Sequence, residues 1–281
     1  MSKLLTRPET IGVVFAILAY LCFSLLDTIQ KTLIIYYSVF QILFIKYFFT
    51  FLLSIIESKR KKNFKFYLTY NWRLQLLRSL LSLLESGCFI LAFRYLSLAD
   101  AHSIGALTPI VVVVFSFIFL KEEISLKIWI AVFLGFIGVL IVMRPGLSVF
   151  NPMSIIPLTG AFFLGLYQIV TRKVSANDKN ETSLFYSGVT GIFLMGFISF
   201  FFWKHISIDF MILFVGVGAF YSLGLYFQII ALSNARASII QPFHYTLIFW
   251  AIGVGFIFFK EILDLFIVIL AFIFALSVIY I

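Results

Sequence analysis

The chain has 281 residues, of which 63% are hydrophobic and 12% are charged, and its mean hydropathy is +1.12. A soluble fold of this length cannot keep so many apolar side chains from water, so the composition excludes a water-soluble protein and predicts one that lies in lipid. The net charge of +9 does not indicate nucleic-acid binding, because the basic residues fall mainly between apolar runs and signal membrane topology. The two cysteines, Cys22 and Cys88, both lie inside apolar runs, so we expect neither a disulfide framework nor a metal site. No bound cofactor is predicted.

Ten apolar runs follow one another along the chain, with polar residues between them. A membrane-spanning helix needs about 20 apolar residues, so the sequence predicts an all-α polytopic membrane protein with ten transmembrane helices. The fifth run is short, and we expect its helix to extend toward Ser125. The first run is too long for a secretory signal and is interpreted as a retained helix. The predicted spans are 10–30, 37–56, 72–93, 101–120, 128–143, 153–171, 183–203, 210–231, 237–258 and 263–281.

The distribution of basic residues predicts the orientation of these helices. With the amino terminus inside, 14 of the 21 Lys and Arg residues fall on the inner side, five fall on the outer side, and Lys46 and Arg78 lie within helices. The excess of basic residues on cytoplasmic loops therefore predicts that both termini are cytoplasmic. The localisation that we expect is the inner membrane of a bacterium.

The chain matches itself weakly at a spacing of about 140 residues, as transporters with internal symmetry do. FSLLDTIQK (23–31) aligns with LGLYQIVTR (164–172), LSLADA (96–101) with LSNARA (232–237), and FLKE (119–122) with FFKE (258–261). The first alignment pairs Asp27 with Gln168 and Lys31 with Arg172. We therefore predict two five-helix repeats, residues 1–146 and 147–281. Five is an odd number, so the second repeat enters the membrane from the opposite face.

The chain resembles the EamA-like family of the drug/metabolite transporter superfamily over nearly its whole length. The resemblance is carried by SLLDTIQK, AFRYLSLADAHSIGALTPI, FLKEEISLKIWIAVFLGFIGVLIVMRPG, LYQIVTRK and ALSNARASIIQPFHYTLIFWAIGVGFIFFKE, in that order. It implies a carrier with a central cavity lined mainly by helices one, three, four, six, eight and nine. The most similar subgroup includes S-adenosylmethionine carriers.

An ionisable side chain at mid-membrane costs about 2.5–3.5 kcal/mol and needs a partner or a function, and six residues are candidates for such positions. Asp27 shares a helical face with Gln30, and together with its repeat counterpart Gln168 it suits recognition of an amine or a cation. The alternative for Asp27 is a polar anchor near the outer surface, or an ion pair with Lys31. The six residues are Asp27, Lys46, Arg78, Glu85, His102 and His244.

Helix three carries Arg78 and Glu85 two turns apart on one face, with Ser82 between them. Their separation of about 10 Å along the helix is too long for a direct pair. We expect Glu85 to bind substrate, and Arg78 either to do so or to extend to the cytoplasmic interface. Lys46 is interpreted as a structural partner of Asp27 or Glu85.

The remaining candidates are histidines, amides and aromatic residues. His102 either begins helix four at the interface or donates into the cavity, and His244 shares a face of helix nine with Gln241 and Tyr245. Most aromatic residues pack against lipid or other helices, and each of those singled out has that alternative. The further candidates for substrate binding are Tyr167, Gln168, Tyr221, Gln228 and Trp250.

These features predict a secondary transporter that moves a small polar or zwitterionic metabolite, amino acid-like or S-adenosylmethionine-like, by alternating access. No nucleotide-binding motif is found, no catalytic residues are predicted, and Glu85 or Asp27 is the candidate for proton coupling. The alternatives are an integral membrane enzyme, a channel, and a sensor or structural protein. An enzyme would need clustered acids and histidines, and a channel would need a filter sequence. Monomer and homodimer both remain open.

Overall fold

The computed structural model describes residues 7–96, 98–143, 151–250 and 253. Within these ranges the chain forms helices and connections, without a strand. Seven of the described helices are long and apolar enough to cross a membrane. The chain is therefore an all-helical, multi-pass membrane protein.

The first eight predicted spans coincide with helical structure, the ninth does so over its described residues up to 250, and the tenth, 263–281, lies outside the described residues. The fifth helix begins at Leu126, next to Ser125 as expected. The elements are α1 (Arg7–Tyr36), α2 (Val39–Arg60), α3 (Trp72–Tyr95), α4 (Leu98–Gly105), α5 (Thr108–Phe115), a π-helical turn (Ser116–Leu120), α6 (Leu126–Met143), a 3-10 turn (Pro152–Ser154), α7 (Ile155–Val174), α8 (Asn180–Phe201), α9 (Ile208–Asn234) and α10 (Ala237–His244).

Helix α1 continues six residues beyond the predicted end at residue 30. Its last turns carry polar side chains, which suggested a helix end at the membrane surface. These side chains are bound inside the protein instead: Gln30 is buried and accepts a hydrogen bond from Lys46. Lys31 Nζ donates to the carbonyl of Phe93 and, at 2.8 Å, to that of Leu96. Polar residues here mark a face toward protein rather than an end of the helix.

The fourth and ninth spans are both interrupted halfway. In the fourth, a turn at Ala106 and Leu107 separates α4 from α5, whose first turn contains a proline. In the ninth, a turn at Tyr245 follows α10. The Tyr245 hydroxyl lies 3.0 Å from the carbonyl of Val132 and 3.4 Å from that of Ala106. The two interruptions therefore lie side by side, and the Tyr245 hydroxyl lies within hydrogen-bond distance of one carbonyl in the interrupted fourth span and of one in α6.

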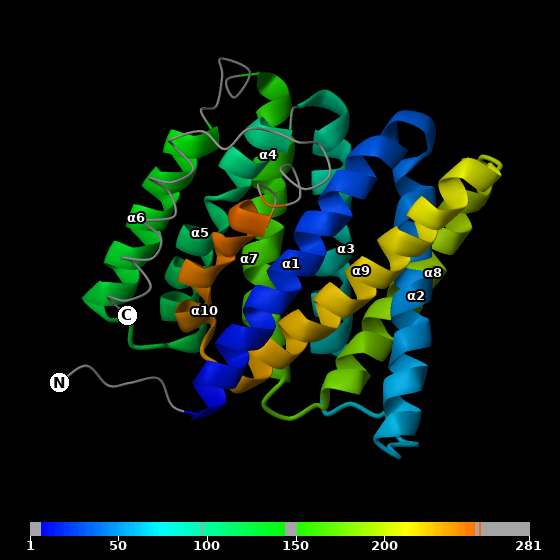
Figure 1. Ribbon diagram of the computed structural model, residues 1–281. Helices are drawn as coiled ribbons and strands as arrows, with labels where there is room; N and C mark the ends of the chain where they lie inside the picture. Colours follow the sequence, from blue (N-terminus) through cyan, green and yellow to red (C-terminus); the bar gives the residue numbers. More distant parts are fainter. Residues whose placement is uncertain (1–6, 97, 144–150, 251–252, 254–281) are drawn as a thin grey trace.

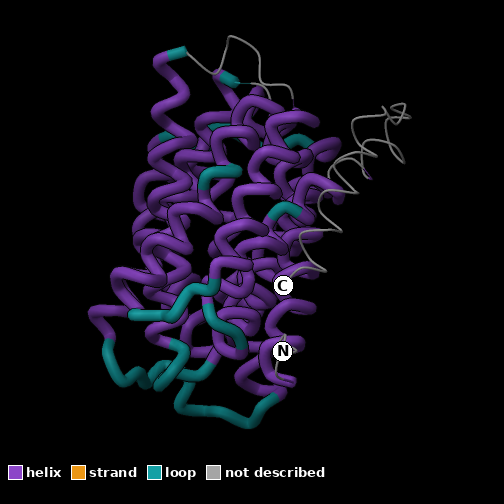
Figure 2. The backbone as a smooth tube through the Cα atoms, turned by 90° about the vertical axis from the view of Figure 1, so that its left-hand side faces the viewer, coloured by secondary structure: helices purple, strands orange, loops and turns teal. Residues whose placement is uncertain are grey.

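The helices form one bundle in which elements distant in sequence pack together. The end where α1 begins is called the lower end and the end where α1 finishes the upper end, as they stand in Figure 1. The main contacts join α1 to α9, α2 to α8 and α3 to α7. Helices α2 and α8 approach so closely that a Cβ on Gly188 would lie 2.7 Å from the backbone of Phe51. Figure 2 shows several of the connecting loops gathered at the lower end of the bundle.

Candidate functional site

A cavity of about 930 Å³, including its mouth, lies among the helices near the middle of the bundle. Its wall comes from α1, α3, α4, α5, α7, α9 and the region around the end of α10. These are the helices that the resemblance implies, and α2 contributes one further residue, Lys46. Concave spaces between the helices of a bundle are common sites for small molecules.

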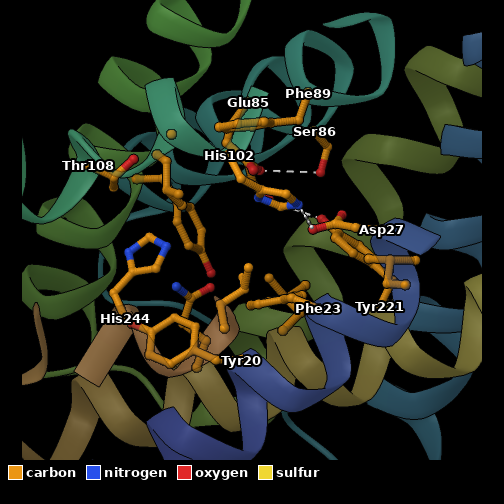
Figure 3. Close-up of a pocket in the computed structure, with 18 of the residues that line it drawn as sticks. Tyr20, Phe23, Asp27, Glu85, Ser86, Phe89, His102, Thr108, Tyr221 and His244 are labelled. Atoms are coloured by element: carbon orange, nitrogen blue, oxygen red, sulfur yellow. Dashed lines mark hydrogen bonds and ion pairs between the residues drawn. The ribbon is translucent and has the colours of Figure 1, made fainter. Parts of the chain in front are cut away.

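Asp27 is fixed at one side of the cavity by two neighbours (Figure 3). Its Oδ1 accepts a hydrogen bond of 3.1 Å from Gln30 on the next turn of α1. Its Oδ2 lies 3.6 Å from Nε2 of His102 in α4. The Asp27 side chain is 17% exposed, so α1 and α4 present a partly accessible carboxylate to the cavity.

Lys46 of α2 is buried beside this carboxylate and is held by uncharged groups. Its Nζ donates to Oε1 of Gln30 at 2.9 Å and to Oγ of Ser86 at 3.2 Å. Ser86 in turn donates to Oε2 of Glu85 at 3.2 Å. One hydrogen-bonded chain therefore runs from Asp27 through Gln30, Lys46 and Ser86 to Glu85, and all five side chains line the cavity.

A second polar group joins α2, α3 and α9 behind Lys46. The hydroxyl of Tyr221 is 3.1 Å from Oγ of Ser82 and donates to the hydroxyl of Tyr47 at 2.9 Å. The ammonium of Lys46 lies 4.1 Å from the centre of the Tyr221 ring, which gives a cation–π contact. These contacts orient both the tyrosine and the lysine toward the same space.

The opposite side of the cavity holds polar atoms without a hydrogen-bond partner in the described part of the chain. The imidazole of His244 stacks on the ring of Tyr20 with centres 4.9 Å apart. Its Nδ1 has no partner there, and neither has Oγ1 of Thr108. Figure 3 shows both side chains at the cavity. Buried polar atoms of this kind are costly unless a ligand or water satisfies them.

The structure brings seven of the predicted site residues into one wall. Lys46, interpreted from the sequence as a structural partner, also lies in this wall, and so do Gln30, Ser86 and Tyr20. A lysine in the middle of an apolar helix was the available signal for Lys46. The seven are Asp27, Glu85, His102, Tyr167, Tyr221, Gln228 and His244.

Four other predicted residues lie outside this wall, and their part in binding stays a prediction. Arg78 is fully buried, and it donates to the carbonyl of Ser183 and to Oγ of Ser187, at 2.7 Å, on α8. The amides of Gln168 and Gln241 bind each other at 2.8 Å. The fourth residue, Trp250, packs against a buried apolar cluster.

The lower end of the bundle is joined by further polar contacts. Lys61 and Asn63 both donate to the carboxylate of Glu181, at 3.0 and 2.9 Å. The hydroxyl of Tyr226 donates to Glu57 at 2.6 Å. These contacts tie α2 and the loop after it to α8 and α9.

Two more contacts at this end join other helices. Gln75 of α3 donates to Asp178 at 2.8 Å. Glu122 accepts from the backbone and hydroxyl of Ser238 at the start of α10. The described lower ends of most helices are thus connected through charged side chains.

The described residues hold no group of three His, Cys, Asp or Glu side chains that could bind a metal ion. The side chains that line the cavity offer two carboxylates, one ammonium, imidazoles, hydroxyls and two amides.

Comparisons with known proteins agree with this architecture. The model of the EamA-like transporter family matches residues 10–144. An uncharacterized transporter of Helicobacter pylori is 28% identical over 269 residues, which cover 90% of this chain and 88% of that protein. An S-adenosylmethionine uptake transporter of Rickettsia conorii is 25% identical, over 90% of this chain and 86% of its own length.

Among solved structures, one crystal structure aligns with a TM-score of 0.81 at 12% identity and covers 97% of this chain and 95% of that one. This likeness concerns the fold alone. The family and sequence matches confirm the resemblance to the EamA-like transporter family.

Proposed function

Because the chain resembles EamA-like transporters and its homologues are named transporters, we propose that it is a secondary transporter in the inner membrane of a bacterium. Its substrate is a small polar or zwitterionic metabolite, amino acid-like or S-adenosylmethionine-like. It works by alternating access at the cavity, with both termini in the cytoplasm. No metal or cofactor takes part.

The observation that carries this proposal is the set of ionisable groups around an empty space inside a membrane protein. Charged side chains in a membrane are rare and mark substrate or ion pathways. Here Asp27, Lys46 and Glu85 all line one cavity. A structural protein gives no reason for such a site, and the transport experiment below separates a carrier from a channel. In an enzyme these groups would act on a bound lipid or metabolite, which the transport experiment below tests.

Two inverted repeats, residues 1–146 and 147–281, are part of the proposal, and equivalent contacts in the two halves support them. Lys31 near the end of α1 binds the carbonyls at the end of α3. Arg172 near the end of α7 binds the carbonyls of Leu232 and Ser233 at the end of α9, at 2.8 and 3.2 Å. Lys31 aligns with Arg172 in the sequence repeat. Each half therefore contains one basic side chain that donates to carbonyls at the end of a neighbouring helix.

Helix packing supports the same relation. An inversion that exchanges α1 with α7 and α3 with α9 turns the α1–α9 contact into the α7–α3 contact, and both are among the most extensive in the protein. It leaves the α2–α8 contact in place. Inverted repeats of this kind let a site at their junction open to either side by rocking.

In the proposed alternating-access mechanism, the lower-end contacts form a closed cytoplasmic gate. The cavity-lining positions of α1, residues 20–30, lie in the middle and upper part of that helix. The bridges of Glu181, Glu57, Asp178 and Glu122 lie below them. In our proposal these bridges break when the upper end closes over substrate.

Within the cavity, Asp27 and Glu85 face the cationic part of the substrate. Gln228, His102 and His244 form hydrogen bonds with it, and the tyrosines at 167 and 221 cover its apolar part. The four candidates outside the wall support the wall from behind: Arg78, Gln168, Gln241 and Trp250. Asp27 or Glu85 is also where a coupled proton would bind.

Counterflow in proteoliposomes tests the proposal. Liposomes loaded with unlabelled S-adenosylmethionine are expected to take up the labelled compound faster than empty ones, because only a carrier is stimulated from the far side. Glu85→Gln should lose this uptake, whereas Glu123→Gln, an exposed carboxylate outside the cavity, should keep it. Uptake without stimulation would indicate a channel, and conversion of the compound would indicate an enzyme.

A further inference from the structure

The three charges of the cavity are separated from one another by uncharged side chains. Buried ions are normally paired directly, because an unpaired charge in a medium of low polarity is strongly unfavourable. Here both hydrogen-bond acceptors of Lys46 are neutral, Gln30 and Ser86. Asp27 and Glu85 likewise accept from these two neighbours, at 3.1 and 3.2 Å. The arrangement holds each charge in place without cancelling it.

Each of the three groups keeps capacity for a further partner. An ammonium has three N–H donors, and Lys46 uses two of them on side chains. A carboxylate has about four acceptor positions. Within the described residues, Asp27 and Glu85 each accept one side-chain hydrogen bond, and His102 lies 3.6 Å from Asp27 as a further neighbour.

The other buried cation nearby does not neutralise this set. Arg78 lies about 10 Å along α3 from Glu85, it does not line the cavity, and its guanidinium is bound to Ser183 and Ser187 of α8. Besides the imidazoles of His102 and His244, the cavity thus presents two carboxylates with the Lys46 ammonium between them.

From this pattern we infer that the substrate carries two cationic groups and one carboxylate, and that Lys46 binds the carboxylate. The inference rests on the proposed transport function and names its substrate class. Asp27 and Glu85 each take one cationic group of the ligand, and the carboxylate of the ligand lies on the Lys46 ammonium between them. Sulfonium amino acids such as S-adenosylmethionine have this charge pattern, and so do basic amino acids.

Other charge patterns leave part of the wall unsatisfied. A diamine without a carboxylate places a second cation beside Lys46. An ordinary zwitterion leaves one carboxylate of the wall without its counter-ion. A neutral compound would displace water from the three charged groups without pairing with any of them, which is unfavourable.

Two matched sets of ligands test the inference in the full-length protein in detergent. The first set is S-adenosylmethionine, S-adenosylhomocysteine, which lacks the sulfonium charge, and decarboxylated S-adenosylmethionine, which lacks the carboxylate. The second set is lysine, norleucine and cadaverine, which differ in the same way. Affinity is measured by microscale thermophoresis. In at least one set we expect the compound with all three charges to bind about 10-fold to 100-fold more tightly than either of the others.

Variants then assign the groups. In Lys46→Met the preference for the ligand with a carboxylate over the one without should fall to about 1-fold, while the preference for the second cation persists. In Glu85→Gln the preference for the ligand with the second cation should fall to about 1-fold, while the preference for the carboxylate persists. Lys59→Met, an exposed lysine of the same helix, should change neither preference. If Lys46→Met does not fold, the comparison of ligands on the unaltered protein still decides.

Several results would overturn the inference. Equal affinity within both sets, absence of binding by every compound, or a carboxylate preference that survives in Lys46→Met would each do so. Counterflow separates these outcomes from the proposed function. If norleucine or neutral riboflavin is exchanged and neither three-charge compound is, the carrier stands and the charge assignment falls. If a three-charge compound binds with the expected preferences but shows no counterflow, the charge assignment is supported and the proposed transport function is contradicted.

Discussion

Helix α3 carries two kinds of buried polar group, and they differ in what surrounds them. Around Arg78, on the lower half of the helix, each named partner is part of the protein: Gln75, the carbonyl of Ser183 and Ser187. Around Glu85, two turns higher, one neighbour is Ser86 and the rest of the surroundings include an empty cavity. The first group connects helices, and the second faces a space that a ligand can fill.

The comparison shows that burial alone does not identify a binding residue in a membrane protein. Both residues are rare charges in an apolar helix, and the sequence left substrate binding open for Arg78 as well as for Glu85. What separates them is their surroundings: Arg78 donates to Gln75 and to α8 and does not line the cavity, although its Nη1 has no hydrogen-bond partner among the described residues, whereas Glu85 lines the cavity. We therefore expect changes at Arg78 to act on stability and changes at Glu85 to act on ligand binding.

The largest effect is expected for Arg78→Met. The change removes contacts between α3 and α8 and leaves the carbonyl of Ser183 and the hydroxyl of Ser187 buried without a donor. It should lower the free energy of unfolding by about 3–5 kcal/mol. Thermal unfolding in detergent measures it, with Arg94→Met, an exposed residue of the same helix, as the control. If the two variants melt at the same temperature, the structural role of Arg78 is wrong.

A smaller effect, confined to binding, is expected for Glu85→Gln and Asp27→Asn. Each removes one charge from the cavity wall and keeps the shape of the side chain. The affinity for S-adenosylmethionine should fall about 10-fold to 100-fold, while the melting temperature changes little. A large loss of stability with unchanged affinity would place these carboxylates with Arg78 as structural groups.

The two halves can be compared in the same way at Lys31 and Arg172. Each side chain satisfies carbonyls at the end of a neighbouring helix, so Lys31→Met and Arg172→Met should each cost about 1–2 kcal/mol of stability. If the repeats rock, the first change should loosen the upper end and the second the lower end. Labelling of cysteines introduced at each end measures this. Loosening of the same end by both would argue against the inverted relation.

The smallest effect is expected for Lys61→Met at the lower end. The Lys61 side chain is 36% exposed, and such partly solvated ion pairs contribute about 1 kcal/mol or less. The melting temperature should shift slightly, and Asn63 still holds Glu181. A shift as large as that of Arg78→Met would show that the lower-end contacts are part of the stabilising core.

Much of the helical architecture was predictable, because apolar runs of membrane length leave few alternatives to a helix. The eight spans that are described in full follow from such patterns. The end of α1 was not predictable from the sequence, because polar residues at 27–32 look the same whether they face water or a protein interior. Only the packing of α1 against α3 shows that Lys31 caps another helix.

The candidate site was predictable in its residue types but not in its grouping. Asp27, Glu85 and His244 stand out as ionisable residues in apolar runs. Lys46 also stands out, yet the sequence does not show that α2 turns this residue toward the cavity. The hydrogen bond from Nε2 of Gln241 to Oε1 of Gln168 depends on the contact between α7 and α10. No local sequence pattern predicts that contact.

The most direct test is the ligand-induced change in melting temperature, measured side by side for three forms of the protein. S-adenosylmethionine should raise the melting temperature of the unaltered protein and, from a lower baseline, that of Arg78→Lys, since a ligand stabilises the folded state that binds it. At the same ligand concentration it should raise that of Glu85→Gln much less. A rise that persists in Glu85→Gln and disappears in Arg78→Lys would contradict the account, because it would place the binding charge at the packed group rather than in the cavity.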